Sequence, residues 1–302
     1  MKYLVTGGHG FIGRHLVAYL VSEGHEVVVV DLEGDFPPKF EYEFVYANIA
    51  GGNFNHKIME AMNGVDTVFH LAAKARVQPS IEHPVKFNQT NVEGTLSLLE
   101  MCRHQNVRRF VFSSSSSIYG DTETFPTPET APKKPLSPYG LQKLIGEQYC
   151  ELYSTIHGLE TVSLRYFNVY GEGAPTEGSY CLVMGKFIQQ TREGKDLTIY
   201  GDGEQRRDFT YVQDVVQANV LASTTEGISG EAFNIGNGDN RSVNQIAEVF
   251  RKPIEYLEPR IEPKVTLADN SKARKLLGWE PSGDVIEWLE NHLVQIGYSE
   301  QK

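Results

Sequence analysis

The first 31 residues hold the pattern that most restricts how this chain can fold. A short apolar segment, residues 3–5, leads into a glycine-rich turn at residues 7–13. Apolar residues then recur at helical spacing, and a continuous run of valines at residues 27–30 ends at Asp31. A short, fully apolar run is typical of a strand buried on both faces of a parallel sheet. The chain therefore begins with a predicted strand–turn–helix–strand unit of an α/β fold.

The three glycines of the turn predict what the unit binds. Gly7 allows a tight turn, Gly10 lets the backbone approach a pyrophosphate at the helix N-terminus, and Gly13 lets the helix pack closely on the strand. Asp31 can accept hydrogen bonds from both ribose hydroxyls and would repel a 2′-phosphate, which favours NAD over NADP. A glycine-rich turn without a ligand is the alternative, but the flanking strands and the acid favour a dinucleotide.

Strand and helix patterns continue to alternate along the chain. Further strands are expected at residues 44–47, 67–71, 110–112 and 161–166, with helices at 92–104 and from 138. The expected fold class is α/β, a Rossmann-type doubly wound parallel sheet with a smaller C-terminal α/β substrate domain. We expect residues 1–172 to form the NAD-binding domain, with a returning segment at about 207–238. Residues 173–206 and 239–302 would form the second domain.

Tyr139 and Lys143 lie four residues apart at the start of one predicted helix. Ser137 is its expected N-cap and Pro138 its first helical residue. The spacing puts both side chains on one face, where the ammonium of Lys143 would stabilise the phenolate of Tyr139. A phenolate can take a proton from a sugar or alcohol hydroxyl near neutral pH. Because this spacing also occurs on surface helices, the rest of the chain must support the interpretation.

Composition excludes several other classes of protein. The formal net charge of -11 argues against a nucleic-acid binder or a protein of anionic membrane surfaces. No apolar run is long enough to span a membrane, and residues 2–6 are too few for a signal segment, so we expect a cytoplasmic protein. Three cysteines without close pairing, and no cluster at metal-ligand spacing, predict no metal site.

Together these motifs resemble the extended short-chain dehydrogenase/reductases, and among them the nucleotide-sugar 4-epimerases of the UDP-galactose 4-epimerase type. The resemblance covers nearly the whole chain. The matching stretches are residues 6–13, 70–73, 91–95, 113–120, 139–143, 164–171, 201–211 and 268–279.

The resemblance implies a tightly bound NAD, a catalytic Tyr139, a Lys143 on the nicotinamide ribose, and a Ser115 that hydrogen-bonds the reacting hydroxyl. It places around the cofactor, beside the glycine turn, Phe11, Ile12, Asp31, Asn48, Ile49, Leu71, Ala72, Ala73, Thr90 and Phe167. It places near the substrate Asn168, Arg207, Arg260 and Thr266. It also implies a UDP-sugar substrate and a homodimer formed through the helices near residues 92 and 138.

Three positions depart from the family pattern. Asn48 stands where an aspartate usually contacts adenine, so this contact loses its charge but can keep its hydrogen bonds. Arg260 is followed directly by Ile261 and Glu262, where a Pro-Gly and an acid are usual, which leaves the role of Glu262 open. Ala75 stands where some members carry a lysine.

The implied reaction is inversion at C4 of a UDP-hexose through a transient 4-keto sugar. Ser116 and Ser117 occupy the positions where related 4,6-dehydratases carry Asp-Glu, and related decarboxylases keep the glutamate, so elimination lacks an acid or base. The small Thr266 resembles members that accept N-acetylhexosamines as well as UDP-glucose and UDP-galactose. A uronate 4-epimerase, a decarboxylase, a 4,6-dehydratase and a cofactor-sensing regulator without activity remain alternatives.

Overall fold

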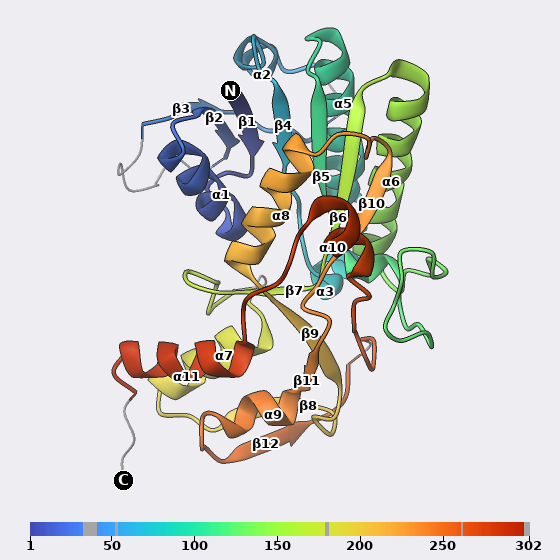
Figure 1. Cartoon of the computed structure of the whole chain (residues 1–302). Coiled ribbons are helices and arrows are strands. Elements are labelled where there is room, and N and C mark those ends of the chain that lie inside the picture. The colour runs from blue at the N-terminus through green and yellow to red at the C-terminus, as the bar shows by residue number, and fades with distance from the viewer. Residues whose placement is uncertain (33–40, 52–53, 179–180, 261, 299–302) are drawn as a thin grey trace.

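A seven-stranded sheet forms the centre of the computed structural model, which describes residues 1–32, 41–51, 54–178, 181–260 and 262–298. The strand order is β3-β2-β1-β4-β5-β6-β10, and every pairing is parallel. The strands are β1 (Lys2–Thr6), β2 (Glu26–Asp31), β3 (Glu43–Tyr46), β4 (Thr67–His70), β5 (Arg109–Ser115), β6 (Glu160–Tyr166) and β10 (Glu231–Ile235). The doubly wound parallel sheet is thus confirmed, and residues 231–235 return to it as β10 (Figure 1).

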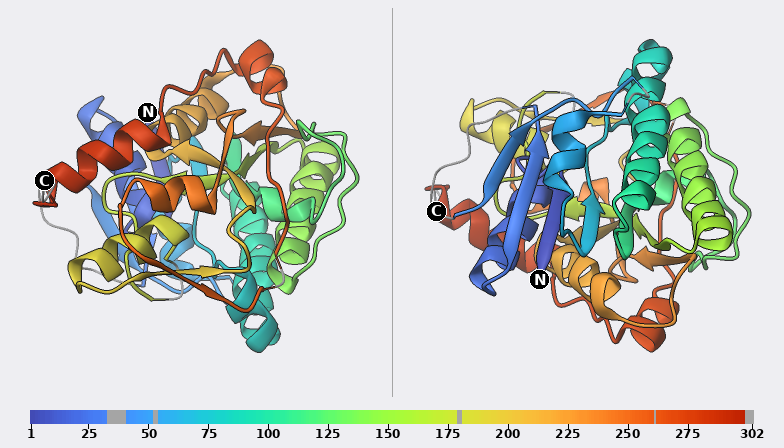
Figure 2. Two further views of the ribbon diagram at one scale, coloured as in Figure 1. Left: turned by 90° about the horizontal axis from the view of Figure 1, so that it is seen from below. Right: turned by 90° about the horizontal axis from the view of Figure 1, so that it is seen from above.

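Helices cover both faces of this sheet (Figure 2). One hydrophobic cluster joins the sheet to α1 (Phe11–Ser22), α8 (Val212–Thr224) and α10 (Ser271–Leu277). A second cluster, on the other face, involves α2 (His56–Ala61), α5 (Thr95–His104) and α6 (Pro138–His157). Helices on both faces explain why the four valines of β2 are all buried.

Smaller elements form a second lobe below the sheet in Figure 1. Its strands are β7 (Asn168–Tyr170), β8 (Leu197–Tyr200), β9 (Arg206–Tyr211), β11 (Asn240–Ser242) and β12 (Ile254–Leu257), in a three-stranded and a two-stranded sheet. Its helices are α7 (Val183–Arg192), α9 (Val243–Glu248) and α11 (Val285–Gln295). These elements share a separate hydrophobic cluster, so the lobe has its own core.

The strand order reverses direction at β1, which has β2 on one side and β4 on the other. In open parallel sheets, ligands bind outside the carboxyl ends of the strands at such a point. The short helices α3 (Val77–Glu82) and α4 (Pro84–Asn88) and the π-helical turn η1 (Gln89–Gly94) follow β4 near this edge. In the described part of the chain, no helix combines the length and apolar character that a membrane crossing requires.

The serine run is more regular than expected. Strand β5 was expected at residues 110–112 but extends to Ser115, because Ser113 to Ser115 pair in register with residues 164–166 of β6. A short 3₁₀ turn, η2 (Ser116–Ile118), then ends the strand. The run therefore carries Ser115 to the carboxyl edge of the sheet.

Candidate active site

A cavity of about 1100 Å³ opens at the carboxyl ends of the parallel strands. Ligand pockets typically enclose about 300–1,000 Å³, so this cavity is large for a ligand site. It is lined by the predicted cofactor and catalytic residues and by one of the predicted substrate residues: Gly7, Gly10, Phe11, Ile12, Gly13, Asp31, Asn48, Ile49, Leu71, Ala72, Ala73, Thr90, Ser115, Tyr139, Lys143, Phe167 and Asn168. The predictions spread over 160 residues of sequence thus meet at one place.

The glycine turn forms the wall at one end of the cavity. Gly7 has φ +71, and a Cβ there would lie 2.7 Å from the backbone nitrogen of Ala72. A Cβ on Gly13 would lie 2.1 Å from the carbonyl oxygen of Gly7. Helix α1 then begins at Phe11 with Gly10 as its N-cap and no side-chain cap, which leaves its first-turn N–H groups for an anion. The turn fits the pyrophosphate of a dinucleotide.

Asp31 ends β2 on the same side of the cavity. Its two carboxylate oxygens accept hydrogen bonds from the backbone nitrogens of His9 at 2.9 Å and Leu32 at 2.6 Å. Each oxygen keeps a further lone pair, so the fixed carboxylate can still accept from ribose hydroxyls. Asn48 accepts from the backbone nitrogen of Ala50 at 2.9 Å, which leaves its amide N–H₂ to donate to a base.

Tyr139 and Lys143 face the cavity from the first turns of α6. Ser137 caps this helix by accepting from the backbone nitrogen of Gly140 at 3.1 Å, with Pro138 at the first position, as predicted. The Lys143 Nζ lies 6.0 Å from the centre of the Tyr139 ring and donates to the carbonyl oxygen of Ser113 at 2.7 Å. Burial lowers the pKa of Lys143 to about 8, so its charge is sensitive to pH near neutrality.

Ser115 is held in one hydrogen-bonding role. Its Oγ accepts from the backbone nitrogen of Ser117 at 3.2 Å and from the Ser117 hydroxyl at 2.9 Å. A serine hydroxyl has two acceptor positions and one proton, so both acceptor positions are used by Ser117. The proton that remains makes Ser115 a hydrogen-bond donor toward the cavity.

Comparison with known proteins agrees with this geometry. The model of the NAD dependent epimerase/dehydratase family matches residues 3–236. The chain belongs to this family. A putative UDP-glucose 4-epimerase of Methanocaldococcus jannaschii is 37% identical over 96% of this chain and 98% of its own length. A UDP-glucuronate 4-epimerase of Thermodesulfobacterium geofontis is 35% identical over 95% and 94% of the two chains.

Among solved structures, the UDP-glucose 4-epimerase of Thermotoga maritima with UDP-glucose has a TM-score of 0.90 and 36% identity. The match covers 99% of this chain and 100% of that one. The resemblance deduced from the motifs is confirmed, and the protein is an epimerase-type enzyme that uses NAD. The fit of the glycine turn and Asp31 to a dinucleotide is independent of these comparisons.

Three predicted substrate residues are not part of the cavity lining. Arg207 is buried, and its Nη2 lies 2.8 Å from the Glu262 Oε2, a contact that lacks hydrogen-bond geometry. Arg260 is exposed and its guanidinium stacks 3.4 Å from the ring centre of Tyr200. Thr266 accepts from the backbone nitrogen of Asp208 at 3.1 Å. Ile261, named above as a departure from the family pattern, lies outside the described residues.

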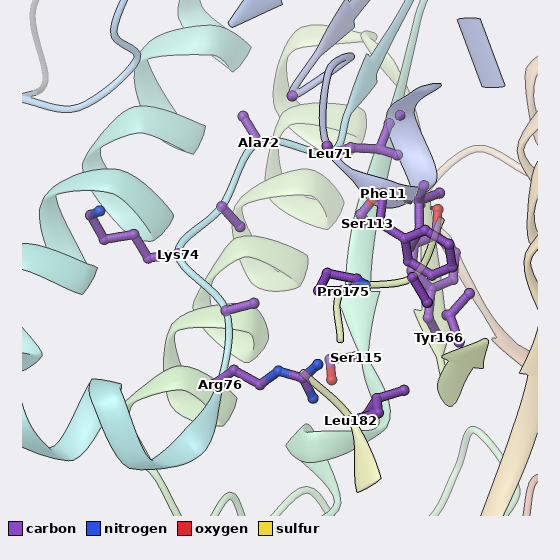
Figure 3. A pocket seen from close by; sticks show the side chains of 18 of the residues that line it. Phe11, Leu71, Ala72, Lys74, Arg76, Ser113, Ser115, Tyr166, Pro175 and Leu182 are labelled. Carbon is purple, nitrogen blue, oxygen red and sulfur yellow. Dashed lines mark hydrogen bonds between the residues drawn. The ribbon is translucent and has the colours of Figure 1, made fainter. Parts of the chain in front are cut away.

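The prediction from sequence missed the opposite wall of the cavity. Arg76, Pro175 and Leu182 line it, together with Trp288 and His292 of α11. Figure 3 shows Arg76 extending toward Ser115, at the end of the cavity away from Phe11. None of these residues belongs to a local motif, and the sequence offered no signal for them.

Proposed function

We propose that the enzyme inverts the configuration at C4 of a UDP-hexose, with UDP-glucose and UDP-galactose as the reference pair. The observation that carries this proposal is the meeting of Tyr139, Lys143 and Ser115 at one cavity with the glycine turn. NAD, when bound, supplies a reversible hydride acceptor. A redox step that is reversed within one turnover changes stereochemistry without a net oxidation.

The side chains have separable roles in this proposal. Tyr139 accepts the proton of the C4 hydroxyl, and Lys143 stabilises the phenolate that must be present beforehand. Ser115 donates a hydrogen bond to the C4 oxygen and continues to do so when this oxygen becomes a carbonyl. Its orientation follows from the two hydrogen bonds that Ser117 donates to it.

The uncharged positions after Ser115 favour epimerisation over elimination. Ser116 lines the cavity and the Ser117 hydroxyl is used to orient Ser115, so neither position brings an acid or base to the sugar. Loss of water across C5 and C6 requires such a group. Inversion at C4 requires only the proton acceptor that Tyr139 provides.

Inversion also requires that the sugar ring rotates to present its other face to NAD while the nucleotide stays bound. We assign binding of the diphosphate to Arg207 and Arg260. We assign further substrate contacts to Asn168, whose amide donates to the carbonyl oxygen of Asp208 at 3.1 Å. Residues 173–206 and 239–302 would then be the domain that holds the nucleotide. Residues 1–172, with about 207–238, would hold NAD.

The size of the sugar substituent that fits depends on Thr266 in this proposal. A small side chain there leaves room for an N-acetyl group, so UDP-N-acetylhexosamines would also be accepted. Thr266→Tyr should exclude these sugars and spare the plain hexoses. Equal turnover of both sugars by this variant would contradict the assignment.

A homodimer is the proposed assembly. Leu141, Leu152 and Ile156 are exposed on one face of α6, at 48%, 48% and 62% of their full accessible area. Their spacing of 11 and 4 residues puts them on one stripe of the helix. Light scattering should show a dimer that a Leu152→Asp substitution converts to monomers.

The proposed activity is tested by incubating the enzyme separately with UDP-glucose, UDP-N-acetylglucosamine and UDP-glucuronate. NMR spectra of the products would show which sugars change configuration at C4. Inversion of at least one of them supports the proposal. Unchanged sugars, or products that have lost water or carbon dioxide, would contradict it.

A further inference from the structure

Glu147 is a buried carboxylate on α6, 7% exposed and not part of the cavity lining. It lies four residues after Lys143 and eight after Tyr139, so the three side chains share one face of the helix. A glutamate is almost never fully buried unless it is paired. The partners of Glu147 therefore indicate what its position serves.

Three hydrogen bonds join this carboxylate to the central sheet. Its Oε1 accepts from the Ser114 hydroxyl at 2.5 Å and from the Arg165 Nε at 2.9 Å, and its Oε2 accepts from the Arg165 Nη2 at 2.8 Å. Arg165 is 2% exposed, and its two bonds have the bidentate geometry that suits a guanidinium and a carboxylate. Glu147 thus ties α6 to β5 through Ser114 and to β6 through Arg165.

Arg165 is itself held by other parts of the chain. Its Nη1 donates to the Tyr119 hydroxyl at 2.8 Å and to the carbonyl oxygen of Glu129 at 3.0 Å. The Tyr119 hydroxyl donates in turn to the side-chain oxygen of Asn234, on β10, at 2.6 Å. Because Arg165 has fixed partners on both sides, it offers Glu147 one place to bind.

Two glycines let α6 lie close to the strand it covers. A Cβ on Gly140 would lie 2.6 Å from the carbonyl oxygen of Ser117, and a Cβ on Gly146 would lie 2.4 Å from the Cζ of Phe112. These contacts limit how near the helix comes to the strand. The directional hydrogen bonds of Glu147 fix its rotation and its place along the strand.

The strand residue that Glu147 binds is the neighbour of Ser115. Ser114 directly precedes Ser115 on β5, and Lys143 donates to the carbonyl oxygen of Ser113 at 2.7 Å. Since Ser115 comes from the strand and Tyr139 from the helix, the distance between their hydroxyls depends on how the helix is placed on the strand. A misplacement of about 1 Å can cost about 100-fold in rate.

We propose that Glu147 is a positioning residue, which holds α6 at the one place on β5 and β6 where Tyr139 and Ser115 reach the same substrate oxygen. This inference rests on the proposed function, from which it takes the roles of Tyr139 and Ser115. Glu147 touches neither NAD nor the sugar and acts through the helix.

The position of Glu147 also affects the charge of Lys143. Burial lowers the pKa of Lys143 to about 8, while the charges of Cys150 and Glu147 favour its ammonium. Burial raises the pKa of the Cys150 thiol and lowers the pKa of His70, on β4, to about 3, so both groups are neutral near pH 7. The carboxylate of Glu147 is therefore a source of the negative charge that keeps this lysine protonated.

Two further titratable groups face this carboxylate and this ammonium. Arg165 approaches the carboxylate from β6, and its cation offsets part of the negative charge that reaches Lys143. The ring centre of Tyr139 lies 6.0 Å from the Lys143 Nζ, so its phenolate depends on the ammonium. Removal of the charge of Glu147 should weaken the ammonium and, through it, the phenolate.

The first test is Glu147→Gln, which keeps the size of the side chain and removes its charge. We measure kcat, KM and the pH profile of C4 inversion with NAD bound. The kcat should fall about 30-fold while KM changes less than about threefold. The alkaline limb of the kcat profile should move about 0.5 pH unit lower, because Lys143 loses its proton at a lower pH.

Glu147→Asp separates position from charge. It keeps the carboxylate but withdraws it by one methylene, so it should lower kcat about as much as Glu147→Gln and leave the alkaline limb in place. Arg165→Lys keeps a cation opposite the carboxylate, so no buried charge is left unpaired, but it loses the bidentate contact. It should lower kcat about tenfold. Full kcat in either variant would overturn the inference.

Glu160→Gln is the matched control. Arg109, which is 1% exposed, pairs with Glu160 at 2.7 Å, and these are the first residues of β5 and β6, at the ends away from Ser115. Loss of this pair should lower the melting temperature and leave kcat and the pH profile unchanged. If Glu147→Gln lowered only the melting temperature as well, Glu147 would be merely structural and the inference would be wrong.

The phenol of Tyr139 gives a readout that needs no sugar. Its titration is the difference between ultraviolet titrations of the enzyme and of Tyr139→Phe, both with NAD bound. Glu147→Gln should raise the midpoint of this titration, and Glu160→Gln should not. If the unaltered enzyme inverts no UDP-sugar, the proposed function fails, and this titration decides the inference. An unchanged midpoint in Glu147→Gln would overturn it.

Discussion

The two walls of the cavity are built in different ways. The cofactor wall consists of backbone and small residues at the ends of parallel strands, where a Cβ added to Gly7 or Gly13 would lie within 3 Å of other main-chain atoms. The opposite wall, called the sugar wall because we propose that the sugar binds there, consists of longer side chains from separate segments, such as Arg76, Leu182 and Trp288. The first wall leaves almost no room for a larger side chain, whereas the shape and charge of the second depend on the side chains themselves.

Tyr139 lines the cavity, and its substitution should have the largest effect. Tyr139→Phe removes the proton acceptor and should lower kcat about 1,000-fold, within the range typical of general acid–base catalysis. NAD binding and the melting temperature should change little. Tyr149→Phe, on the same helix, is the matched control and should keep full activity. A Tyr139→Phe enzyme with more than a tenth of the original kcat would remove Tyr139 from this role.

Alanine substitutions in the glycine turn measure how little room the cofactor wall leaves for a side chain. A Cβ at position 13 would lie 2.1 Å from the Gly7 oxygen, whereas a Cβ at position 10 would meet only this oxygen, at 3.1 Å. Gly13→Ala should therefore weaken NAD about 100-fold and lower the free energy of unfolding by about 2–3 kcal/mol. Gly10→Ala should have a much smaller effect on stability. Calorimetry on both variants would contradict this account if their unfolding free energies were equal.

Lys143 makes the cofactor wall sensitive to pH. Because burial lowers its pKa to about 8, the ammonium is lost above that pH and the phenolate of Tyr139 loses its support. Activity should fall about tenfold per pH unit above pH 8. Lys143→Arg keeps a charge at high pH, so any activity it retains should show no such decline. A pH profile that stays flat to pH 10 would exclude this role.

The same pKa has the opposite effect on stability. The unfolded lysine keeps its proton up to its ordinary pKa of 10.5, whereas the folded one releases it near 8. Between these values the unfolded state binds more protons, so this group makes the free energy of unfolding increase with pH. Activity and stability should therefore diverge above pH 8, which urea titrations at several pH values would show.

The smallest effect is expected from Glu262, on the sugar side. Its carboxylate pairs with Arg207 at 2.8 Å but is 40% exposed, so solvent weakens the pair. If Arg207 binds the diphosphate, Glu262 competes for it, and Glu262→Gln should tighten UDP about threefold. Arg207→Gln should weaken UDP instead. Weaker UDP binding in the Glu262 variant would show that the carboxylate orients Arg207 rather than competing for it.

The residues predicted from the sequence to bind NAD line one cavity, because their geometry depends on local pattern. Gly7, Gly13 and Asp31 are required by contacts within one strand–turn–helix–strand unit, and Tyr139 is placed by a cap two residues before it. The spacing alone therefore brought these residues to the cavity.

The sugar wall could not be predicted in this way. Arg76 follows a backbone segment that Asn91 holds through Lys74, and Asn91 lies 15 residues away from Arg76 and shares no motif with it. Whether a given arginine contacts the cavity depends on how the second lobe packs, and the sequence pattern does not specify this. The longer β5 was missed for a similar reason, because serines are poor strand formers and only the pairing with β6 extends it.

The most direct test follows the hydrogen on C4 of the sugar. UDP-glucose and UDP-glucuronate deuterated at C4 are converted in ordinary water, and NMR spectroscopy locates the label in the product. Because the hydrogen leaves and returns within one turnover, the account predicts a C4-inverted product that keeps its deuterium. Inverted product with hydrogen from water at C4, or labelled product whose only change is at C5 or C6, would contradict it.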